Sequence, residues 1–119
     1  MQIIFEQNLV NDLREKYIVL ELDTVIHEGM EKPVILYALI ENIGFTELTN
    51  LPDLISQHQT MVSQYKNNEY DDAVFNAYAL KGQWHGELDE FYDLVIETLK
   101  SYKDSNEYWG GIRYTNPVN

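Results

Sequence analysis

Cysteine is absent from the 119 residues of this sequence. Its absence excludes disulfide bonds, thiol catalysis and thiolate metal sites, and it is typical of a cytoplasmic protein. Long apolar runs are also missing. No stretch approaches the roughly 20 apolar residues needed to span a bilayer, and residues 1–7 lack the basic start of a signal peptide. We therefore expect a cytoplasmic location and no membrane association.

Positive charge is scarce. The chain has 8 lysines and arginines against 20 aspartates and glutamates, which gives a formal net charge of −12. This field repels a phosphate backbone, so we expect no direct binding of nucleic acid. The same field favours a basic protein partner or a cation.

The sequence contains enough apolar material for one small core. Hydrophobic residues make up 45% of the chain, which is typical of a single domain over residues 1–119. Nine tyrosines and four phenylalanines predict an aromatic-rich core and rim. We divide the domain into a mainly β part (1–50), a helical part (51–103) and an aromatic tail (104–119).

Residues 17–26 have the clearest strand pattern. β-Branched and aromatic side chains dominate this segment. The alternation of strand side chains places Ile18, Leu20 and Leu22 on one face and Asp23 on the other. We therefore expect a half-buried strand.

A second strand is predicted over residues 34–41. This segment is apolar on both faces, which indicates a central or helix-covered strand, although a buried helix is the alternative. The intervening loop, 27–33, joins the two strands into an antiparallel hairpin. Residues 1–5 are a candidate third strand, and 8–16 have the pattern of one or two helical turns.

Helical periodicity follows in three segments, namely 51–66, 70–80 and 87–103. Between the first two, Asn67 and Asn68 can adopt left-handed backbone angles, which favours a helical hairpin. We therefore predict an α+β fold in which three helices cover a small antiparallel sheet. In the tail, we expect Trp109 to fold back onto the core or onto a partner.

The helical hairpin carries a family resemblance. Tyr65 ends the first helix, a polar turn follows, and Tyr70 and Ala73 open the second helix. Residues 61–80 thus resemble a single tetratricopeptide-like hairpin. The family's Trp, Leu and Gly positions and its closing proline are not matched, so the resemblance implies one hairpin and not a solenoid.

A broader resemblance involves the whole chain. A short acidic β-hairpin precedes the helices, residues 86–92 read Gly-Glu-Leu-Asp-Glu-Phe-Tyr, and a Trp-Gly pair comes late. This arrangement is similar to small proteins of marine tailed phages. The resemblance implies a viral origin and a host cytoplasm, and it brings no known activity.

The histidines offer little catalytic chemistry. His58 lies on the apolar stripe of its helix, which predicts a core imidazole bonded to a carbonyl. His27 falls in the hairpin loop and should be solvated. His85, between Trp84 and Glu87, is the best candidate for chemistry, although an aromatic plug beside a helix start explains the same residues. We expect no enzyme active site.

Carboxylates on the third helix suggest a metal site. Glu90, Asp93 and Glu97 follow one another at spacings of three and four residues, which Mg²⁺ or Ca²⁺ could bridge. However, di-metal helical proteins repeat a Glu-x-x-His pattern on separate helices, and the sequence has none. We expect a solvated acidic face without metal or cofactor, and keep a metal-dependent enzyme as a third alternative.

Two non-enzymatic functions are the main hypotheses. In the favoured one, aromatic side chains line a groove or rim that binds a protein partner; they are Tyr65, Tyr70, Tyr78, Trp84 and Trp109. In the second, an acidic cluster imitates nucleic-acid phosphates and occupies a host nucleic-acid-binding protein; its members are Glu69, Asp71, Asp72, Glu87, Asp89, Glu90, Asp93 and Glu97.

The two hypotheses share a candidate binding surface. We expect the hairpin turn to bring its own residues close to the acids of the third helix. The candidate residues are Tyr70, Asp71, Asp72, Trp84, His85, Glu87, Glu90 and Trp109. A homodimer through the sheet edge or the third helix is a further hypothesis.

Overall fold

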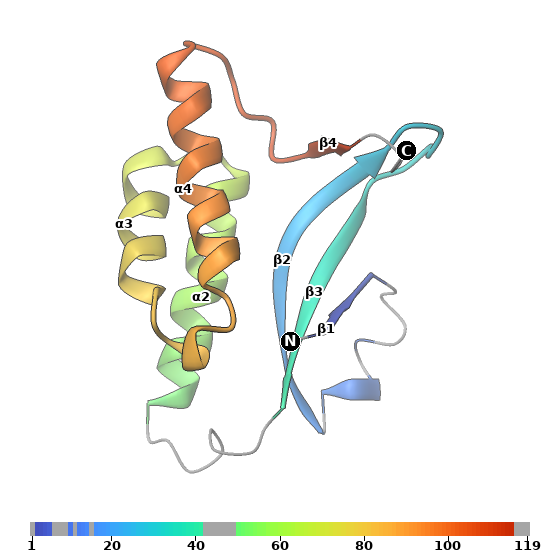
Figure 1. The fold of residues 1–119 in the computed structure, drawn as a ribbon, viewed down its shortest axis with the longest axis vertical. Coiled ribbons are helices and arrows are strands. Elements are labelled where there is room, and N and C mark those ends of the chain that lie inside the picture. The colour runs from blue at the N-terminus through green and yellow to red at the C-terminus, as the bar shows by residue number, and fades with distance from the viewer. Residues whose placement is uncertain (1, 6–9, 11, 15, 42–49, 116–119) are drawn as a thin grey trace.

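The fold is known from a computed structural model of the chain (Figure 1). The structure describes residues 2–5, 10, 12–14, 16–41 and 50–115. In chain order its elements are β1 (Gln2–Ile4), β2 (Tyr17–His27), β3 (Val34–Glu41), α2 (Leu51–Lys66), α3 (Tyr70–Leu80), the 3-10 turn η1 (Trp84–Gly86), α4 (Asp89–Asp104) and β4 (Arg113–Thr115).

The strands form a mixed sheet in the order β1-β3-β2-β4. β2 and β3 form an antiparallel hairpin with Leu20 opposite Ala38, and β1 adds to β3 with Ile3 opposite Ala38. The predicted hairpin and third strand are confirmed, and the alternative of a helix over 34–41 is wrong. The sequence pattern does not predict β4, in which the tail returns to pair with β2 in the parallel direction.

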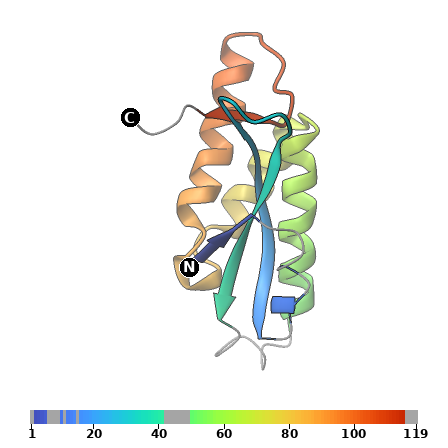
Figure 2. The ribbon, with the colours of Figure 1, turned by 90° about the vertical axis from the view of Figure 1, so that its right-hand side faces the viewer.

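The helices form two layers on one face of this sheet. α2 and α4 lie side by side against the sheet, and α3 packs on their far side (Figures 1 and 2). α3 buries Ala73, Ala77 and Leu80. The two alanines have small side chains, which let the α3 backbone approach both neighbouring helices. The main core therefore lies between the sheet and the α2–α4 pair and continues up to α3.

A smaller core covers the opposite face of the sheet. It consists of the buried residues Val10, Val19, Tyr37 and Leu39, with Leu13 packed against them. Val10, Asp12 and Leu13 have helical backbone, in agreement with the helical turns predicted over 8–16; residues 8, 9, 11 and 15 lie outside the described part of the chain. Because helices and turns cover both faces, β3 is apolar on both.

The helix ends follow the local sequence closely. α2 and α3 have the predicted bounds, and Asn68 takes a left-handed backbone angle (φ 61°) between them. The third helix starts at Asp89 and not at the predicted residue 87, because the η1 turn comes immediately before it.

The tail after α4 returns along the helices to the sheet (Figure 1). Trp109 is 2% exposed and stacks on Tyr65, with the ring centroids 5.3 Å apart. The expectation that Trp109 folds back onto the core is confirmed. Two residues later, Gly111 (φ 81°) lies so close to α2 that a Cβ atom would stand 2.6 Å from the carbonyl oxygen of Lys66.

We predict that Gly111→Ala destabilises the fold by about 1–3 kcal/mol, because it combines a left-handed backbone angle with a steric clash. Urea unfolding measures the change. Gly110→Ala is the matched control, since a Cβ atom there meets nothing within 4 Å. Equal stability losses in the two variants would show that the tail does not pack on α2 in this way.

Candidate functional site

The predicted binding residues do not form one surface, because α3 and α4 run antiparallel. At the start of α3, the Lys103 Nζ atom lies 4.1 Å from the Tyr70 ring centroid and 3.8 Å from Asp71 Oδ1. At its other end, Lys81 Nζ lies 2.6 Å from Asp93 Oδ1. The hairpin turn therefore meets the basic end of α4 and not its acidic start.

The candidate residues fall into two groups as a result. Tyr70, Asp71 and Asp72 belong to the first turn of α3, where Tyr70 is half-buried and both aspartates are exposed. His85, Glu87 and Glu90 lie at the opposite end of the helix pair, where His85 and Glu90 are exposed and Glu87 is half-buried. The expectation that the hairpin turn lies beside the acids at the start of the third helix is wrong.

The predicted aromatic rim is wrong for three of its five residues, whereas Tyr78 is exposed and Tyr70 half-buried. Tyr65, Trp84 and Trp109 are 0%, 1% and 2% exposed, so none of them can serve as a surface anchor. Trp84 and His85 both have left-handed backbone angles (φ 57° and 55°). The indole of Trp84 is buried, and its Nε1 donates a hydrogen bond to the Tyr92 hydroxyl at 2.9 Å. Residue type alone does not show which aromatic side chains are covered.

An exposed aromatic pair does exist, on α3. Phe75 and Tyr78 are 74% and 60% exposed. They lie on the exposed side of α3, which we call the α3 outer face; its residues are Asp71, Asp72, Phe75, Tyr78 and Ala79. Asp71 lies at the edge of this face, where Lys103 of α4 reaches it. Sequence analysis missed Phe75. The available signal was that Phe75 falls outside the apolar stripe of its own helix.

A buried polar cluster lies between the helices and the sheet. It joins Asp23 of β2, Tyr65 of α2, Thr98 of α4 and Arg113 of β4. Arg113 donates from Nε to Asp23 Oδ2 (2.8 Å) and from Nη2 to the hydroxyls of Tyr65 (2.9 Å) and Thr98 (2.7 Å). Tyr65 donates to Asp23 Oδ1 at 2.7 Å. Each member of the cluster thus comes from a different element.

The position of Asp23 corrects a prediction from the strand pattern. Simple alternation puts it on the face away from Leu20 and Leu22. The pairing of β2 with β3 shifts register between Glu21 and Thr24, which is the mark of a β-bulge. Asp23 lies in this bulge, is 4% exposed and bonds to a side chain of α2.

The cluster keeps its charges and protons fixed. Burial and the adjacent Asp23 carboxylate raise the pKa of Tyr65, so its hydroxyl stays protonated and donates. Burial alone would lower the pKa of Arg113, but its bonds to Asp23 and Tyr65 raise the pKa instead. The arrangement is an ion pair held by several hydrogen bonds, which suits positioning and not proton transfer.

A second buried network surrounds His58. Its Nε2 lies 2.7 Å from the Glu21 carbonyl oxygen, which can only accept, so Nε2 carries the proton. Nδ1 then accepts from the Tyr92 hydroxyl at 2.9 Å. Burial lowers the pKa of His58 to about 4. The predicted core imidazole bonded to a carbonyl is confirmed, and it is neutral at pH 7.

Metal binding has no support in the described residues. Among them, no three histidine, aspartate or glutamate side chains come together as ligands. Of the carboxylates considered for a metal on the third helix, Asp93 pairs with Lys81, and Glu90 and Glu97 are exposed.

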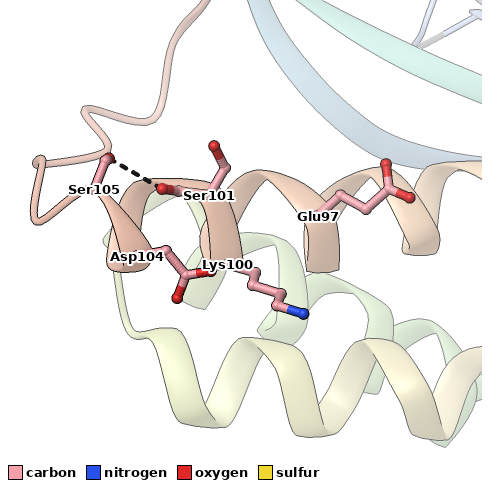
Figure 3. A pocket seen from close by; sticks show the side chains of 5 residues that line it. All are labelled: Glu97, Lys100, Ser101, Asp104 and Ser105. Atoms are coloured by element: carbon pink, nitrogen blue, oxygen red, sulfur yellow. Dashed lines mark hydrogen bonds between the residues drawn. The ribbon is translucent and has the colours of Figure 1, made fainter.

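The surface hollows differ in what lines them. A shallow hollow along the end of α4 is lined by Glu97, Lys100, Ser101, Asp104 and Ser105. Figure 3 shows that these side chains come from one helix and its end, without converging on a point. A second hollow of about 300 Å³, which we call the edge groove, lies between β1 and α4; Ile3, Leu22, Asp23, Leu36, Glu90, Phe91 and Leu94 line it.

No family model, curated protein or solved structure matches the chain. Within the described residues, no helix is long and apolar enough to cross a membrane. The functional interpretation therefore depends on the chain's own surfaces and clusters.

We predict that Arg113→Met destabilises the protein by about 3 kcal/mol, because it leaves the Asp23 carboxylate buried without its cation. Adding Asp23→Asn to this variant should restore part of the loss, since the buried charge is then absent. Urea unfolding of both proteins measures the difference. Lys81→Met, which breaks an exposed ion pair, is the control and should change little. A double variant less stable than Arg113→Met would contradict the interpretation.

We predict that His58 makes stability depend on pH. Its pKa is lower in the folded state, so the unfolded chain binds the proton more readily between pH 6.5 and 4, and stability falls as pH falls through this window. The loss between pH 7 and about pH 4.5 should be about 2 kcal/mol larger in the wild type than in His58→Gln. Equal slopes for wild type and His58→Gln would rule out this role.

Proposed function

We propose that the protein is a non-enzymatic protein-binding module whose α3 outer face receives a basic partner segment. The observation that carries this proposal is the exposure of Phe75 and Tyr78, at 74% and 60%, on a helix that is otherwise well packed. Large aromatic side chains are usually covered in folded proteins, and exposed clusters of them often mark binding surfaces.

The geometry of the α3 outer face suits an anchor for a partner. Phe75 and Tyr78 are three residues apart and therefore neighbours on the helix surface. Covering a phenylalanine side chain is favourable by about 1.5–3 kcal/mol. Tyrosine adds a hydroxyl that can bond at the rim of an interface. Two such anchors are enough to dominate a small interface.

The charge around these aromatic residues selects the kind of partner. Asp71 and Asp72 are exposed one turn before Phe75, and α3 itself contains no lysine or arginine. Lys103 of α4 lies 3.8 Å from Asp71 Oδ1, which leaves Asp72 as the main negative charge of this face. The whole chain carries a net charge of −12. A partner segment with lysine or arginine beside an apolar stripe would match both features. A second copy of the same chain would bring aspartates against aspartates here.

We predict that Phe75→Ala combined with Tyr78→Ser weakens binding about thirtyfold, equivalent to about 2 kcal/mol. The probe is a display library of helical peptides selected on the wild-type protein. Selected peptides should combine lysine or arginine with an apolar stripe. Tyr108→Ser and Tyr114→Ser are matched controls, because these tyrosines are 75% and 79% exposed on other segments.

Salt separates this proposal from its alternative. Binding anchored by aromatic side chains should persist at about 0.5 M salt, where exposed charges are screened within a few ångström. Loss of all binding well below that concentration would favour the acidic mimic of nucleic acid. Equal losses in the double variant and in the Tyr108→Ser control would overturn the assignment to α3.

A further inference from the structure

A further hollow, which we call the back cleft, lies where the smaller core meets α2. Its volume is about 500 Å³, which is within the usual range for small-ligand sites. The helical turn before β2 borders it on the side of the sheet away from the helices (Figure 1). Its lining comes from this turn (Arg14), from β2 and β3 (Val19, Glu21 and Tyr37) and from α2 (Gln59, Val62, Ser63, Lys66 and Asn67). Unlike the hollow at the end of α4, the back cleft is thus formed by packing between distant segments.

The charge of the back cleft is opposite to that of the whole chain. The sequence has 8 lysines and arginines against 20 aspartates and glutamates. Two of these basic side chains, Arg14 and Lys66, line the back cleft together with a single carboxylate, Glu21. The edge groove, by contrast, has two carboxylates, Asp23 and Glu90, and neither lysine nor arginine among the described residues that line it. A hollow with more cations than carboxylates attracts an anion that the rest of the surface repels.

Both cations keep hydrogen-bond donors for a ligand. Lys66 Nζ lies 2.8 Å from Glu21 Oε2, which restrains its side chain and uses one of the three donors of the ammonium group. The Lys66 side chain is 18% exposed, so it forms part of the wall. Arg14 is exposed and has no ion-pair partner among the described carboxylates. Its planar guanidinium group can donate to both oxygens of one carboxylate.

The floor of the back cleft is apolar and well packed. Val19 and Tyr37 are each 5% exposed and belong to the smaller core, and Val62 of α2 is 2% exposed. Around this floor are three neutral polar side chains, namely Gln59, Ser63 and Asn67. An apolar base with a few polar and charged groups at its rim is the usual composition of a small-ligand site.

We propose that the back cleft binds a small organic monocarboxylate with an apolar body. The carboxylate would lie between Arg14 and Lys66, and the apolar body would cover Val19 and Val62. Two cations against the one carboxylate of Glu21 leave one positive charge, which matches a single ligand carboxylate. A phosphate monoester carries about two negative charges, so the acidic chain would repel it more strongly. The described residues of α3 contribute nothing to the lining, so this site is independent of the proposed function.

Titrations followed by the NMR shifts of backbone amides test the proposal. The carboxylate probes are 3-phenylpropionate, benzoate and hexanoate; acetate, phenyl phosphate and the neutral 3-phenylpropionamide are the comparison compounds. The first three should shift the amides of Val19 and Val62, with the best dissociation constant at about 1 mM or below. 3-Phenylpropionamide should bind at least about tenfold more weakly than 3-phenylpropionate, because it lacks the charge for Arg14. Acetate should also bind about tenfold more weakly, because it has almost no apolar body.

Two pairs of matched variants locate the ligand. Arg14→Gln should weaken the binding of 3-phenylpropionate about tenfold, whereas Lys16→Gln, which removes the same charge from an exposed residue outside the lining, should change it little. Gln59→Trp should fill the back cleft and abolish binding. Thr60→Trp, at the exposed neighbouring position outside the lining, should leave binding unchanged. All four changes replace exposed side chains, so we expect the variants to fold.

Several results would overturn the proposal. If none of the three carboxylate probes shifted the amides of Val19 and Val62, the back cleft would not be their site. Equal affinity for acetate and 3-phenylpropionate would indicate an adventitious ion only, and equal affinity for the carboxamide would exclude recognition of the charge. Tighter binding of phenyl phosphate would exclude the choice of a carboxylate. Equal losses within either pair of variants would place the ligand elsewhere.

Discussion

The ion pair between Asp23 and Arg113 joins positions 90 residues apart in the sequence, and the arrangement of the other elements depends on it. A carboxylate that is 4% exposed is tolerated only beside a cation and hydrogen-bond donors. Arg113 provides these while also binding Tyr65 and Thr98, so a single guanidinium fixes the tail against the sheet and both inner helices. We infer that the pair contributes less to net stability than to the choice of one arrangement.

Local sequence patterns predicted the elements well and their assembly less well. The ranges of α2 and α3 and the β2–β3 hairpin follow from periodicity and turn residues, which act over a few positions. β4 and the buried side chain of Asp23 escaped prediction. The first is a three-residue strand that exists only because the tail reaches β2, and the second depends on a bulge that reverses the alternation of side chains. Both features arise from contacts between distant segments.

The candidate binding surface shows the same limit. The pattern identified aromatic and acidic residues but could not tell which aromatic side chains are covered. Trp84 and His85 have left-handed backbone angles, and the Trp84 side chain is buried. Phe75 is exposed because Ala73 and Ala77 lie on the buried side of α3. His58 was assigned correctly, since its place on the apolar stripe of a long helix is a local signal. Exposure is a tertiary property, and helical spacing gives only the side of the helix.

A ribosome adds residues in sequence order, so the separation of Asp23 from Arg113 affects the order in which parts of the fold can form. β2, β3 and the helices can form their local contacts as they emerge, but Asp23 lacks its cation until residue 113 has been synthesised. A buried carboxylate without a partner is costly, so the final docking of the helices onto the sheet should wait until Arg113 has been synthesised. The tail would then close the fold as its last step, with the slow kinetics that long-range pairing imposes.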